Sequence, residues 1–369
     1  MSKEERNYRY RRLVLGTLRR LLEWRARLTH RRFSCRALAG TVRDGIFVNS
    51  DMTVSCNCQD VDGSGRLGSL RRQRFEEVFA GPVAAGFRRA LASGRLPTSR
   101  CPACFHLEIV PAGKALAQLH DFSLPQGLSV ENTVHCNLRC LSCCRQKILD
   151  TRRDGQSLSL ADVKTVAETL RRLGARYCGY YNLGEPFFSP DIGRELAILR
   201  RLNPEMEILT STNGLLLDTD QKRQAALLLD DVLFSIDGVS TEMVRRYQRG
   251  GDFDRAYRNL AALVRYRDAR GLARPRIQWK YVVFRWNDNP SHARRAIELA
   301  RSAGADGIQF VFARTPAHGI SWRFLLSPFY RSLGVRDGWR SRCVWLRPLR
   351  AKPLAPDLSA GKDACTEAA

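Results

Sequence analysis

Short apolar runs alternate with amphipathic stretches along the second half of the chain. The apolar runs are rich in β-branched and aromatic residues and predict strands at 128–134, 177–183, 206–211, 232–236, 277–284 and 307–312. The stretches between them have the apolar spacing of helices, at 160–173, 191–202, 219–229, 253–270 and 291–303. Ser159 followed by Asp162 is a capping pair for the first of these helices. This α/β alternation predicts a parallel sheet with right-handed crossovers, closed as a partial (β/α)6 TIM-like barrel.

The first half has a different pattern and predicts a second, smaller unit. A hairpin is expected at 45–54 around Asn49, Ser50 and Asp51, and one amphipathic helix at 75–93. Pro111 and the segment 125–127 mark a linker. We therefore expect a small N-terminal cysteine-rich metal-binding domain at 34–123 and a barrel domain at 124–318. Residues 319–369 are punctuated by prolines and predict a less regular C-terminal extension and tail.

Residues 1–33 predict a basic amphipathic helix. Its apolar stripe would consist of Val14, Leu15, Leu18, Leu21, Leu22 and Leu28, with arginines around it. Such a helix can make peripheral contact with a membrane or bind an acidic partner. The interpretation that we favour is that the stripe packs on the body of the protein and that the basic face is solvated.

The charge of the chain narrows the classes of partner. It has 61 basic and 37 acidic residues among 369, a net charge of +24, and 44% of its residues are hydrophobic. This composition predicts a folded protein, and no apolar run approaches the roughly 18–20 residues of a membrane span. A basic surplus suggests polyanions, but the arginines are scattered along the whole chain. Nucleic acid is therefore an unlikely partner in this interpretation, and it stays an alternative.

The 12 cysteines carry more information than the charge. Disulfide scaffolds are usually short, and this chain is long. The first 33 residues hold eleven Lys or Arg and three Asp or Glu, and lack the apolar core of a secretory signal. We expect a reducing, cytoplasmic location, where clustered cysteines more often hold metal than form disulfides.

One cysteine cluster follows the first predicted strand directly. Cys136, Cys140 and Cys143 have the spacing C-x3-C-x2-C. Three thiolates on a short loop can bind three corners of a cubane cluster and leave the fourth iron open to a small molecule. The alternative is a zinc site, which would need a fourth ligand. His135 and Cys144 are poorly spaced for that role.

This motif resembles the one that defines the radical S-adenosylmethionine superfamily. The resemblance implies that Cys136, Cys140 and Cys143 are catalytic and hold a [4Fe–4S] cluster. The open iron would chelate the amino and carboxylate groups of S-adenosylmethionine. Ser142 departs from the pattern, since an aromatic residue usually precedes the third cysteine and packs near the adenine.

Later motifs resemble the same superfamily, and the resemblance spans roughly 128–312. Each follows a predicted strand, at 182–186 (NLGEP), 211–214 (STNG) and 235–238 (SIDG). The implied cofactor-binding residues are Gly184 and Glu185 for the amino group, Asn213 beside the cofactor, Ser235 for the ribose or carboxylate, and Asp237 for shaping the site. Arg249 is the implied partner of the cofactor carboxylate, with Arg246 as the alternative.

The cysteines before the barrel resemble those of the SPASM auxiliary domain of peptide-modifying radical enzymes. The resemblance implies that Cys35, Cys56, Cys101 and Cys104 hold a second [4Fe–4S] cluster, with Cys58 as a substitute for Cys56. In those relatives the module usually follows the barrel, whereas here it precedes it. Four thiolates would also suit a structural zinc ion, which stays an alternative.

Together the motifs imply a radical S-adenosylmethionine enzyme, an oxidoreductase or transferase. It would cleave S-adenosylmethionine reductively to a 5′-deoxyadenosyl radical, which would activate a C–H bond of a peptide or small-metabolite substrate. An electron donor such as flavodoxin or ferredoxin would be a partner. Two alternatives stay open: a radical enzyme that modifies RNA, motivated by the net charge, and a non-catalytic scaffold protein with zinc at both cysteine sets.

Overall fold

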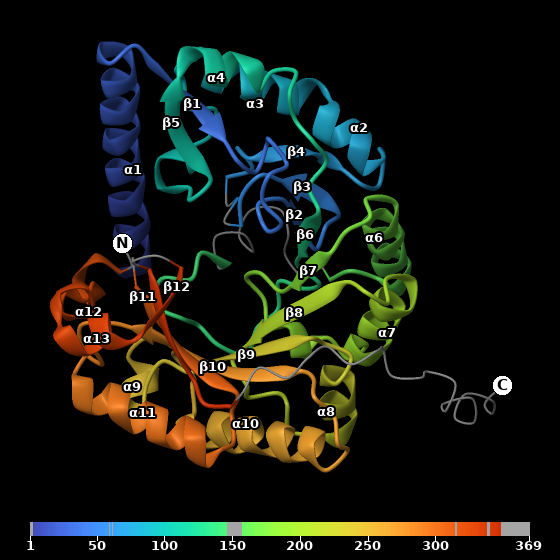
Figure 1. Cartoon of the computed structure of the whole chain (residues 1–369), viewed down its shortest axis with the longest axis vertical. Coiled ribbons are helices and arrows are strands. Elements are labelled where there is room, and N and C mark those ends of the chain that lie inside the picture. The colour runs from blue at the N-terminus through green and yellow to red at the C-terminus, as the bar shows by residue number, and fades with distance from the viewer. Residues whose placement is uncertain are drawn as a thin grey trace.

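The structure is a computed structural model that describes residues 3–58, 60, 62–145, 157–313, 316–337 and 340–347. A curved sheet forms an open ring with helices on its outer side (Figure 1). Its eleven strands lie in the order β12-β13-β11-β10-β9-β8-β7-β6-β2-β3-β4. The part of the tail beyond residue 347 lies outside the described residues.

The middle of this sheet is a run of parallel strands. In spatial order these strands are β6 (Gly127–Val130), β7 (Tyr177–Tyr180), β8 (Glu207–Thr212), β9 (Asp231–Ser235), β10 (Arg276–Val283) and β11 (Gly307–Phe312). Every adjacent pair among them is parallel. The predicted parallel α/β sheet is therefore confirmed. Because parallel strands share one direction, the loops that follow them all emerge at the same edge.

Helices cover the outer face of these strands, as the alternation predicts (Figure 1). They are α6 (Leu160–Arg172), α7 (Ile192–Leu202), α8 (Asp220–Ala226), α10 (Phe253–Asp268) and α11 (Pro290–Ser302). The predicted cap of α6 is present: the hydroxyl of Ser159 accepts a bond from the Asp162 amide at 3.1 Å, and the Asp162 carboxylate accepts one from the Ser159 amide at 3.1 Å. The short helix α9 (Thr241–Arg245) follows β9.

The two faces of the parallel strands differ in what they pack against. Alternate residues such as Cys178, Ile208 and Val232 belong to the large apolar core under the helices. Their neighbours Tyr177, Leu209 and Leu233 form a small separate cluster on the inner face. Since side chains alternate along a strand, the inner face is the one available to line a site.

The cysteine-rich half is joined to the barrel through the sheet. β2 (Phe47–Val48) pairs in parallel with β6, and β3 (Thr53–Ser55) and β4 (Arg66–Ser69) extend the sheet in antiparallel fashion. The predicted hairpin is confirmed by the β2–β3 pairing. β1 (Arg31–Cys35) and β5 (Leu107–Pro111) form a separate antiparallel pair. Sheet pairing therefore crosses the boundary that the sequence suggests near residue 123.

The prediction of a single helix at 75–93 is wrong. The structure has two helices, α2 (Phe75–Ala80) and α3 (Pro82–Ala92), which meet at Gly81. Pro82 is the first residue of α3, where its missing N–H leaves no bond unmade. The backbone before a proline avoids the helical region, and Gly81 is extended, with φ −69° and ψ 176°.

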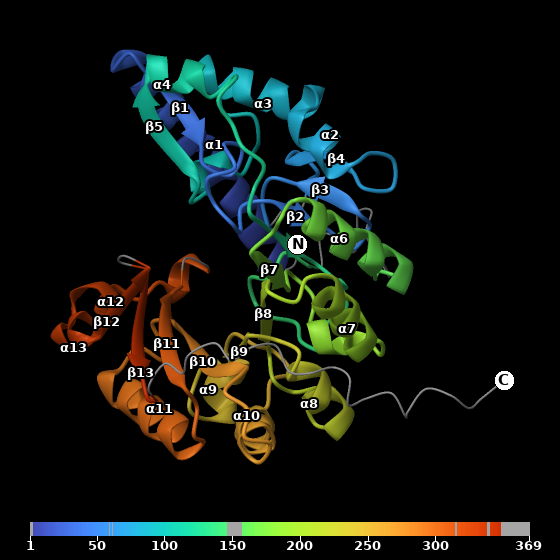
Figure 2. The same cartoon turned by 45° about the vertical axis from the view of Figure 1, so that its right-hand side comes forward.

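Three further short segments lie in the described chain, two in the first half and one in the barrel. These are η1 (Cys101–Ala103), α4 (Ala112–Ala117) and, after β7, η2 (Pro186–Phe188). The helices α2, α3 and α4 lie together at one end of the molecule, and the helices after β10 lie at the other end (Figure 2).

The region after β11 has more regular structure than its prolines predict. It contains η3 (Ala317–Gly319), α12 (Trp322–Leu326), α13 (Pro328–Ser332), β12 (Gly334–Asp337) and β13 (Ser341–Trp345). β13 pairs antiparallel with β11 and with β12. These strands are stabilised by partners distant in the sequence, so their local pattern carries little signal.

The basic amphipathic helix is confirmed as α1 (Lys3–Leu28). Its expected packing is wrong for most of the stripe, because Leu18, Leu21 and Leu28 are 40%, 54% and 61% exposed. Only part of the helix, around Leu22 and Ala26, packs against the core. Among the described residues, no helix combines the length and apolarity needed to cross a membrane.

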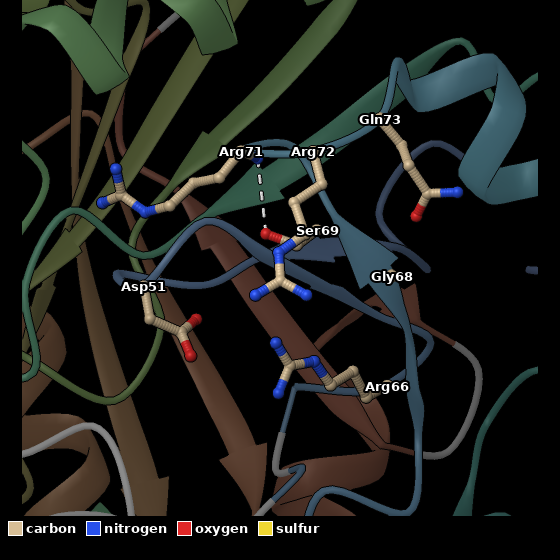
Figure 3. Close-up of a pocket in the computed structure, with 7 residues that line it drawn as sticks. All are labelled: Asp51, Arg66, Gly68, Ser69, Arg71, Arg72 and Gln73. Atoms are coloured by element: carbon tan, nitrogen blue, oxygen red, sulfur yellow. Dashed lines mark hydrogen bonds between the residues drawn. The ribbon is translucent and has the colours of Figure 1, made fainter.

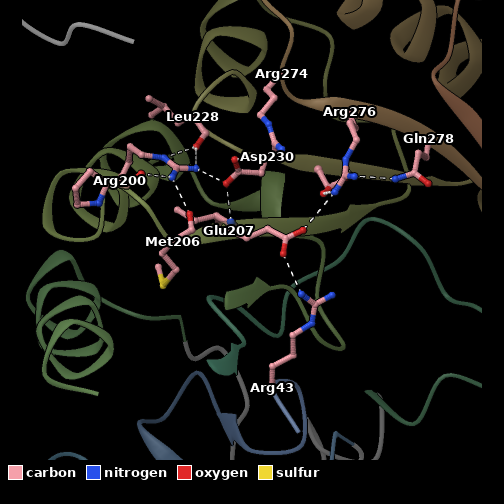
Figure 4. Close-up of polar contacts among 12 residues, drawn as sticks. Arg43, Arg200, Met206, Glu207, Leu228, Asp230, Arg274, Arg276 and Gln278 are labelled. Carbon is pink, nitrogen blue, oxygen red and sulfur yellow. Dashed lines mark hydrogen bonds and ion pairs between the residues drawn. The ribbon is translucent and has the colours of Figure 1, made fainter. Parts of the chain in front are cut away.

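Buried ion pairs join the helices to the strands (Figure 4). The Arg200 guanidinium of α7 donates to the Asp230 carboxylate at 2.6 Å, and both side chains are less than a tenth exposed. It also donates to the carbonyl oxygens of Leu228, Pro204 and Met206. Asp230 in turn accepts a bond from the Ile208 amide at 2.8 Å. This arrangement holds α7 and the start of β8 against the segment that precedes β9.

Arg200→Met should destabilise the protein by about 3 kcal/mol, because it leaves several buried carbonyl oxygens without a donor, whereas Arg274 still pairs with the Asp230 carboxylate at 3.0 Å. Arg194→Met on the same helix is the matched control. Arg194 pairs with Asp191 at 3.2 Å, but its side chain is 74% exposed, so its loss should cost about 0–1 kcal/mol. Urea unfolding midpoints measure both. Equal shifts in the two variants would contradict the assignment.

Candidate active site

The cysteine loop, residues 136–144, follows β6 at the edge of the sheet where the parallel strands end. Its backbone is held by the segment after α9: the Arg139 amide donates to the Arg249 carbonyl at 3.0 Å, and the Leu141 amide donates to the Tyr247 carbonyl at 2.9 Å. Within the loop, the Cys143 amide donates to the Cys140 carbonyl at 3.1 Å. The segment after α9 therefore holds the cysteine loop in place through two backbone hydrogen bonds.

Two nitrogen atoms, one from the loop and one from the segment after β8, are directed at the sulfur of Cys136. The Leu138 amide donates to Cys136 Sγ at 3.4 Å, and Asn213 Nδ2 lies 3.9 Å from the same sulfur. Hydrogen bonds to a ligating sulfur stabilise its thiolate and tune the metal that it holds.

The thiols of this loop share one electrostatic environment. Burial raises the pKa of Cys136 to about 11, and the Leu138 amide opposes that shift. Burial also raises the pKa of Cys140 well above its usual range, and the neighbouring Cys143, Cys136 and Asp237 add to the rise. At Cys140, negative charge on these neighbours therefore adds to the effect of burial. A bound cation reverses this effect, because a coordinating thiol is deprotonated.

Arg145 lies beneath the loop and was missed by the sequence reasoning. Its guanidinium is buried and donates to the Leu138 carbonyl at 3.0 Å and to the Val134 carbonyl at 3.5 Å. Its charge lowers the pKa of both Cys136 and Cys140. The only signal in the sequence is a basic residue next to the motif, and basic residues occur throughout this chain.

Gly184 and Glu185 lie against the cysteine loop. The Glu185 amide donates to the His135 carbonyl at 2.8 Å. A Cβ at Gly184 would overlap the Thr133 carbonyl oxygen, so only glycine permits this approach of the two backbones. The motif after β7 is therefore packed directly on the start of the cysteine loop.

The Glu185 carboxylate is buried and is bonded within the protein. It accepts bonds from the Asn213 amide at 2.7 Å and the Thr212 hydroxyl at 2.6 Å, and a longer one from Phe187. Burial raises the pKa of Glu185 to about 7, and these bonds oppose the shift. The binding of a ligand amino group by Glu185 stays a prediction, and in the structure the carboxylate joins the loops after β7 and β8.

Asn213 connects the end of β8 to the cysteine loop. Besides its contact with Cys136, its Nδ2 donates to Asn137 Oδ1 at 2.8 Å. Gly214 follows with a φ of +77°, and a Cβ there would lie 2.7 Å from the Phe234 ring. The Thr-Asn-Gly sequence thus turns the chain sharply and directs the asparagine toward the thiols.

Asp237 lies on the opposite side of the cysteine loop, after β9. Its carboxylate accepts a bond from the Val282 amide at 3.0 Å, and its own amide donates to Gln248 Oε1 at 3.1 Å. Burial raises the pKa of Asp237 to about 7, and its charge acts on Cys140. The predicted residue therefore lies near the thiols and organises the loop around it.

Ser235 belongs to a polar group on the inner face of the strands. Its hydroxyl lies 3.0 Å from the Ser211 hydroxyl, which accepts a bond from Lys280 Nζ at 3.0 Å. Burial lowers the pKa of Lys280, and Asp237 opposes that shift. Lys280 was also missed by the sequence reasoning, because a single lysine within an apolar strand has no motif around it.

The two arginines considered for carboxylate binding differ in position. The carbonyl of Arg249 accepts a bond from the Arg139 amide of the cysteine loop, and the Arg249 side chain is exposed. Arg246 forms an exposed ion pair with Glu242 at 3.2 Å. Arg249 is therefore the one of the two whose backbone contacts the cysteine loop directly.

The cysteines of the first half gather at a second place. Cys35, Cys56, Cys101 and Cys104 line one small pocket with apolar side chains including Leu38, Phe87 and Leu91. Burial raises the pKa of Cys35 to about 12, with contributions from Cys104 and Cys101, and Cys35, Cys101 and Cys104 likewise add to the raised pKa of Cys56. Cys58 is not among the lining residues and is exposed.

Both thiol sets have the chemistry that suits an iron–sulfur cluster. Each brings three or four cysteines together in a partly apolar surrounding, and cysteine thiolate is the usual ligand of such clusters. In the described part of the chain, no three His, Cys, Asp or Glu side chains form a group that could hold a single metal ion. The fit of both sets to a cluster therefore rests on their cysteine ligands and on the partly apolar surroundings that these ligands share.

A cavity of about 530 Å³ lies beside β4, apart from the cysteine loop (Figure 3). It is lined by Asp51, Arg66, Gly68, Ser69, Arg71, Arg72 and Gln73. Arg71 pairs with Asp162 at 3.0 Å, whereas the guanidinium groups of Arg66 and Arg72 are directed toward the same space. This surface of the first half is strongly basic.

Comparison with known proteins agrees with this geometry. Residues 130–269 match the model of a family described as the Radical SAM superfamily. A GTP 3′,8-cyclase of Peptoclostridium acidaminophilum is 32% identical over 134 residues, which are 35% of this chain and 39% of that protein. A PqqA peptide cyclase of Gluconobacter oxydans is 28% identical over 208 residues, 56% of this chain and 54% of that protein. The chain thus spans about half or less of these relatives.

Among solved structures, the chain is similar to anSMEcpe with bound AdoMet and a Kp18Cys peptide. The two are 18% identical, the match covers 50% of each chain, and the TM-score is 0.38. The match of residues 130–269 coincides with the cysteine loop and with the strand-end motifs that surround it. Through this segment, the chain is similar to enzymes of the radical SAM superfamily.

Proposed function

We propose that this protein is a radical S-adenosylmethionine enzyme whose reaction centre is the cysteine loop. Cys136, Cys140 and Cys143 would hold a [4Fe–4S] cluster, and S-adenosylmethionine would bind at its open iron. When bound, the pair supplies a 5′-deoxyadenosyl radical able to abstract hydrogen from an unactivated C–H bond. The observation that carries the proposal is geometric: the loop with Cys136, Cys140 and Cys143 is held, where the parallel strands end, by backbone bonds to residues 247 and 249, and Asn213 reaches the sulfur of Cys136.

The residues around the thiols have distinct tasks in this proposal. Arg145 lies close enough to lower the pKa of Cys136 and Cys140, so its charge favours their thiolate forms. Asn213 donates toward the sulfur of Cys136 and would adjust the reduction potential of the cluster. Glu185 acts as a positioning residue, because its carboxylate fixes the Asn213 amide. Gly184 lets the backbone approach the cofactor amino group closely.

Ser235 would contact the ribose or the carboxylate of S-adenosylmethionine, and Lys280 would supply positive charge there. Lys280 reaches Ser235 through Ser211, with 3.0 Å at each step. A half-buried ammonium that already bonds a hydroxyl can bind a carboxylate more strongly than an exposed guanidinium can, because water screens it less. In this proposal Lys280 takes the role that the sequence assigned to Arg249.

The substrate class follows from the relatives only in outline. The two curated relatives are named as cyclases of a nucleotide and of a peptide. We propose a peptide or small-metabolite substrate for this chain, bound on the inner face of the strands. A cytoplasmic donor of the flavodoxin or ferredoxin type would reduce the cluster.

The first half would hold a second [4Fe–4S] cluster as an auxiliary centre. Cys35, Cys56, Cys101 and Cys104 are the ligands in this proposal, and Cys56 is preferred to Cys58 because it lines the common pocket. Since β2 pairs with β6, such a centre would be carried by an extension of the sheet that also carries the cysteine loop.

Cys140→Ala should abolish cleavage of S-adenosylmethionine, because the cluster loses one of its three ligands. The assay is production of 5′-deoxyadenosine by anaerobically reconstituted, dithionite-reduced protein. Cys144→Ala is the matched control, since it removes a neighbouring thiol that is not a proposed ligand, and it should retain cleavage. Persistent cleavage in Cys140→Ala would overturn the ligand assignment.

Cys101→Ala should lower bound iron from about eight to about four atoms per chain, because one of two four-iron clusters is lost. Cys58→Ala should keep about eight. Iron, sulfide and zinc analysis of the reconstituted proteins distinguishes the cases. Unchanged iron together with loss of zinc in Cys101→Ala would show a structural zinc site and refute the second cluster, without affecting the first.

Lys280→Met should weaken S-adenosylmethionine binding by roughly 10- to 150-fold, the range for loss of one charge-assisted hydrogen bond. Lys280→Arg should recover part of the affinity, and Arg249→Met should change it little. Equilibrium dialysis against the reconstituted protein measures all three. The opposite order, with Arg249→Met the damaging variant, would restore the assignment made from the sequence.

A further inference from the structure

An ordinary surface helix turns its apolar side toward the protein, whereas α1 turns much of its apolar side toward the solvent. One side of it contacts the protein: Arg19 donates to the Leu96 carbonyl at 2.5 Å, and Glu23 accepts from the Leu96 amide at 2.9 Å. Leu22 and Ala26 pack on the core along the same side. The polar anchors of α1 therefore face inward, together with only two or three of its apolar residues.

The other side of α1 is apolar and exposed. Residues of a helix are about 100° apart, so the side chains of Leu13, Val14, Leu21, Trp24 and Leu28 form one stripe on the side away from Ala26, and Leu18 lies between this stripe and the side that contacts the protein. Their exposed fractions are 71% for Leu13, 38% for Val14, 40% for Leu18, 54% for Leu21, 61% for Trp24 and 61% for Leu28. A stripe of this kind is normally buried, and its exposure marks an interaction surface.

Arginines border this outward stripe. Arg20 and Arg27 lie along one edge and Arg25 along the other, and all of them are exposed. Residues 12–32 contain seven arginines and a single carboxylate, Glu23, which is already bonded to Arg19 and Leu96. The partner must therefore offer an apolar layer and negative charge next to each other.

The shape of the surface identifies the partner further. α1 is a straight helix at the edge of the molecule beside β1 (Figure 1), and the outer side of a straight helix is convex across its width and straight along its length. A convex stripe suits a plane better than it suits the groove of a folded protein. A second copy of this chain is disfavoured because the two copies, each with a net charge of +24, would bring their arginines together.

We propose that α1 binds the surface of an anionic lipid bilayer, with the stripe from Leu13 to Leu28 in the interface and the flanking arginines at the headgroups. Trp24 lies in the middle of the stripe, and tryptophan favours the boundary between headgroups and acyl chains. Leucines and a tryptophan on one side with arginines at its borders are the composition of helices that lie in the plane of a membrane. This attachment is independent of the chemistry at the cysteine loop.

Co-sedimentation with vesicles tests the proposal. The full-length protein should sediment with phosphatidylglycerol–phosphatidylcholine vesicles, bind pure phosphatidylcholine much more weakly, and be released in part by salt. Replacing Arg20, Arg25 and Arg27 with Gln should weaken binding to the anionic vesicles about 100-fold, since each arginine near such a surface contributes about fivefold.

A second variant removes the apolar part of the surface. Leu21→Ser with Trp24→Ser should abolish vesicle binding, whereas Val83→Ser, at an exposed valine on α3, should leave it unchanged. Circular dichroism checks that both variants keep their helices, and 5′-deoxyadenosine production separates this test from that of the proposed function.

Three results would overturn the proposal. One is equal binding of wild type and the double variant to anionic vesicles. Another is a dimer in solution that the double variant dissolves, which would assign the stripe to a second copy of the chain. The last is binding to an acidic polypeptide such as poly-glutamate but to neither kind of vesicle, which would assign the surface to an acidic protein.

Discussion

A buried carboxylate joins the parts of the site to each other. Glu185 accepts bonds from the amide of Asn213 and the hydroxyl of Thr212, while its own amide donates to the His135 carbonyl. Three loops from β6, β7 and β8 are held together in this way, and Asn213 is thereby directed at Cys136. Because the carboxylate is buried, any loss of these partners would leave a charge without solvation, so the arrangement has few alternatives.

The sheet determines where the loops that Glu185 joins lie. Parallel strands bring the loops after β6, β7, β8 and β9 to one edge, and α9 with the following segment adds the carbonyls of Tyr247 and Arg249. The pairing of β2 with β6 extends the same sheet into the cysteine-rich half. Of the second thiol set, Cys56 follows β3 and is attached to this extension, whereas Cys35 lies on β1 of the separate antiparallel pair.

Periodicity predicted the parallel strands and their helices to within a few residues, because each is long or strongly patterned. It failed where the decisive partner is distant or the break is local. β12 and β13 depend on β11, and the helix at 75–93 is divided by Gly81 and Pro82. In the site, the motif residues were found by their spacing, whereas Lys280 and Arg145 were missed because their importance comes from the side chains beside them.

The amino-acid sequence was sufficient to establish the cysteine spacing, the order of strand-end motifs and the amphipathic character of the first helix, since these are local properties of the chain. The tertiary structure was needed to place Cys56, and not Cys58, in the pocket with Cys35, Cys101 and Cys104, to connect Lys280 with Ser235, and to show the bonds of Glu185 within the protein. It also decided the direction of the apolar stripe of α1. Helical periodicity defines a stripe but not the side on which the body of the protein lies, and that depends on long-range packing.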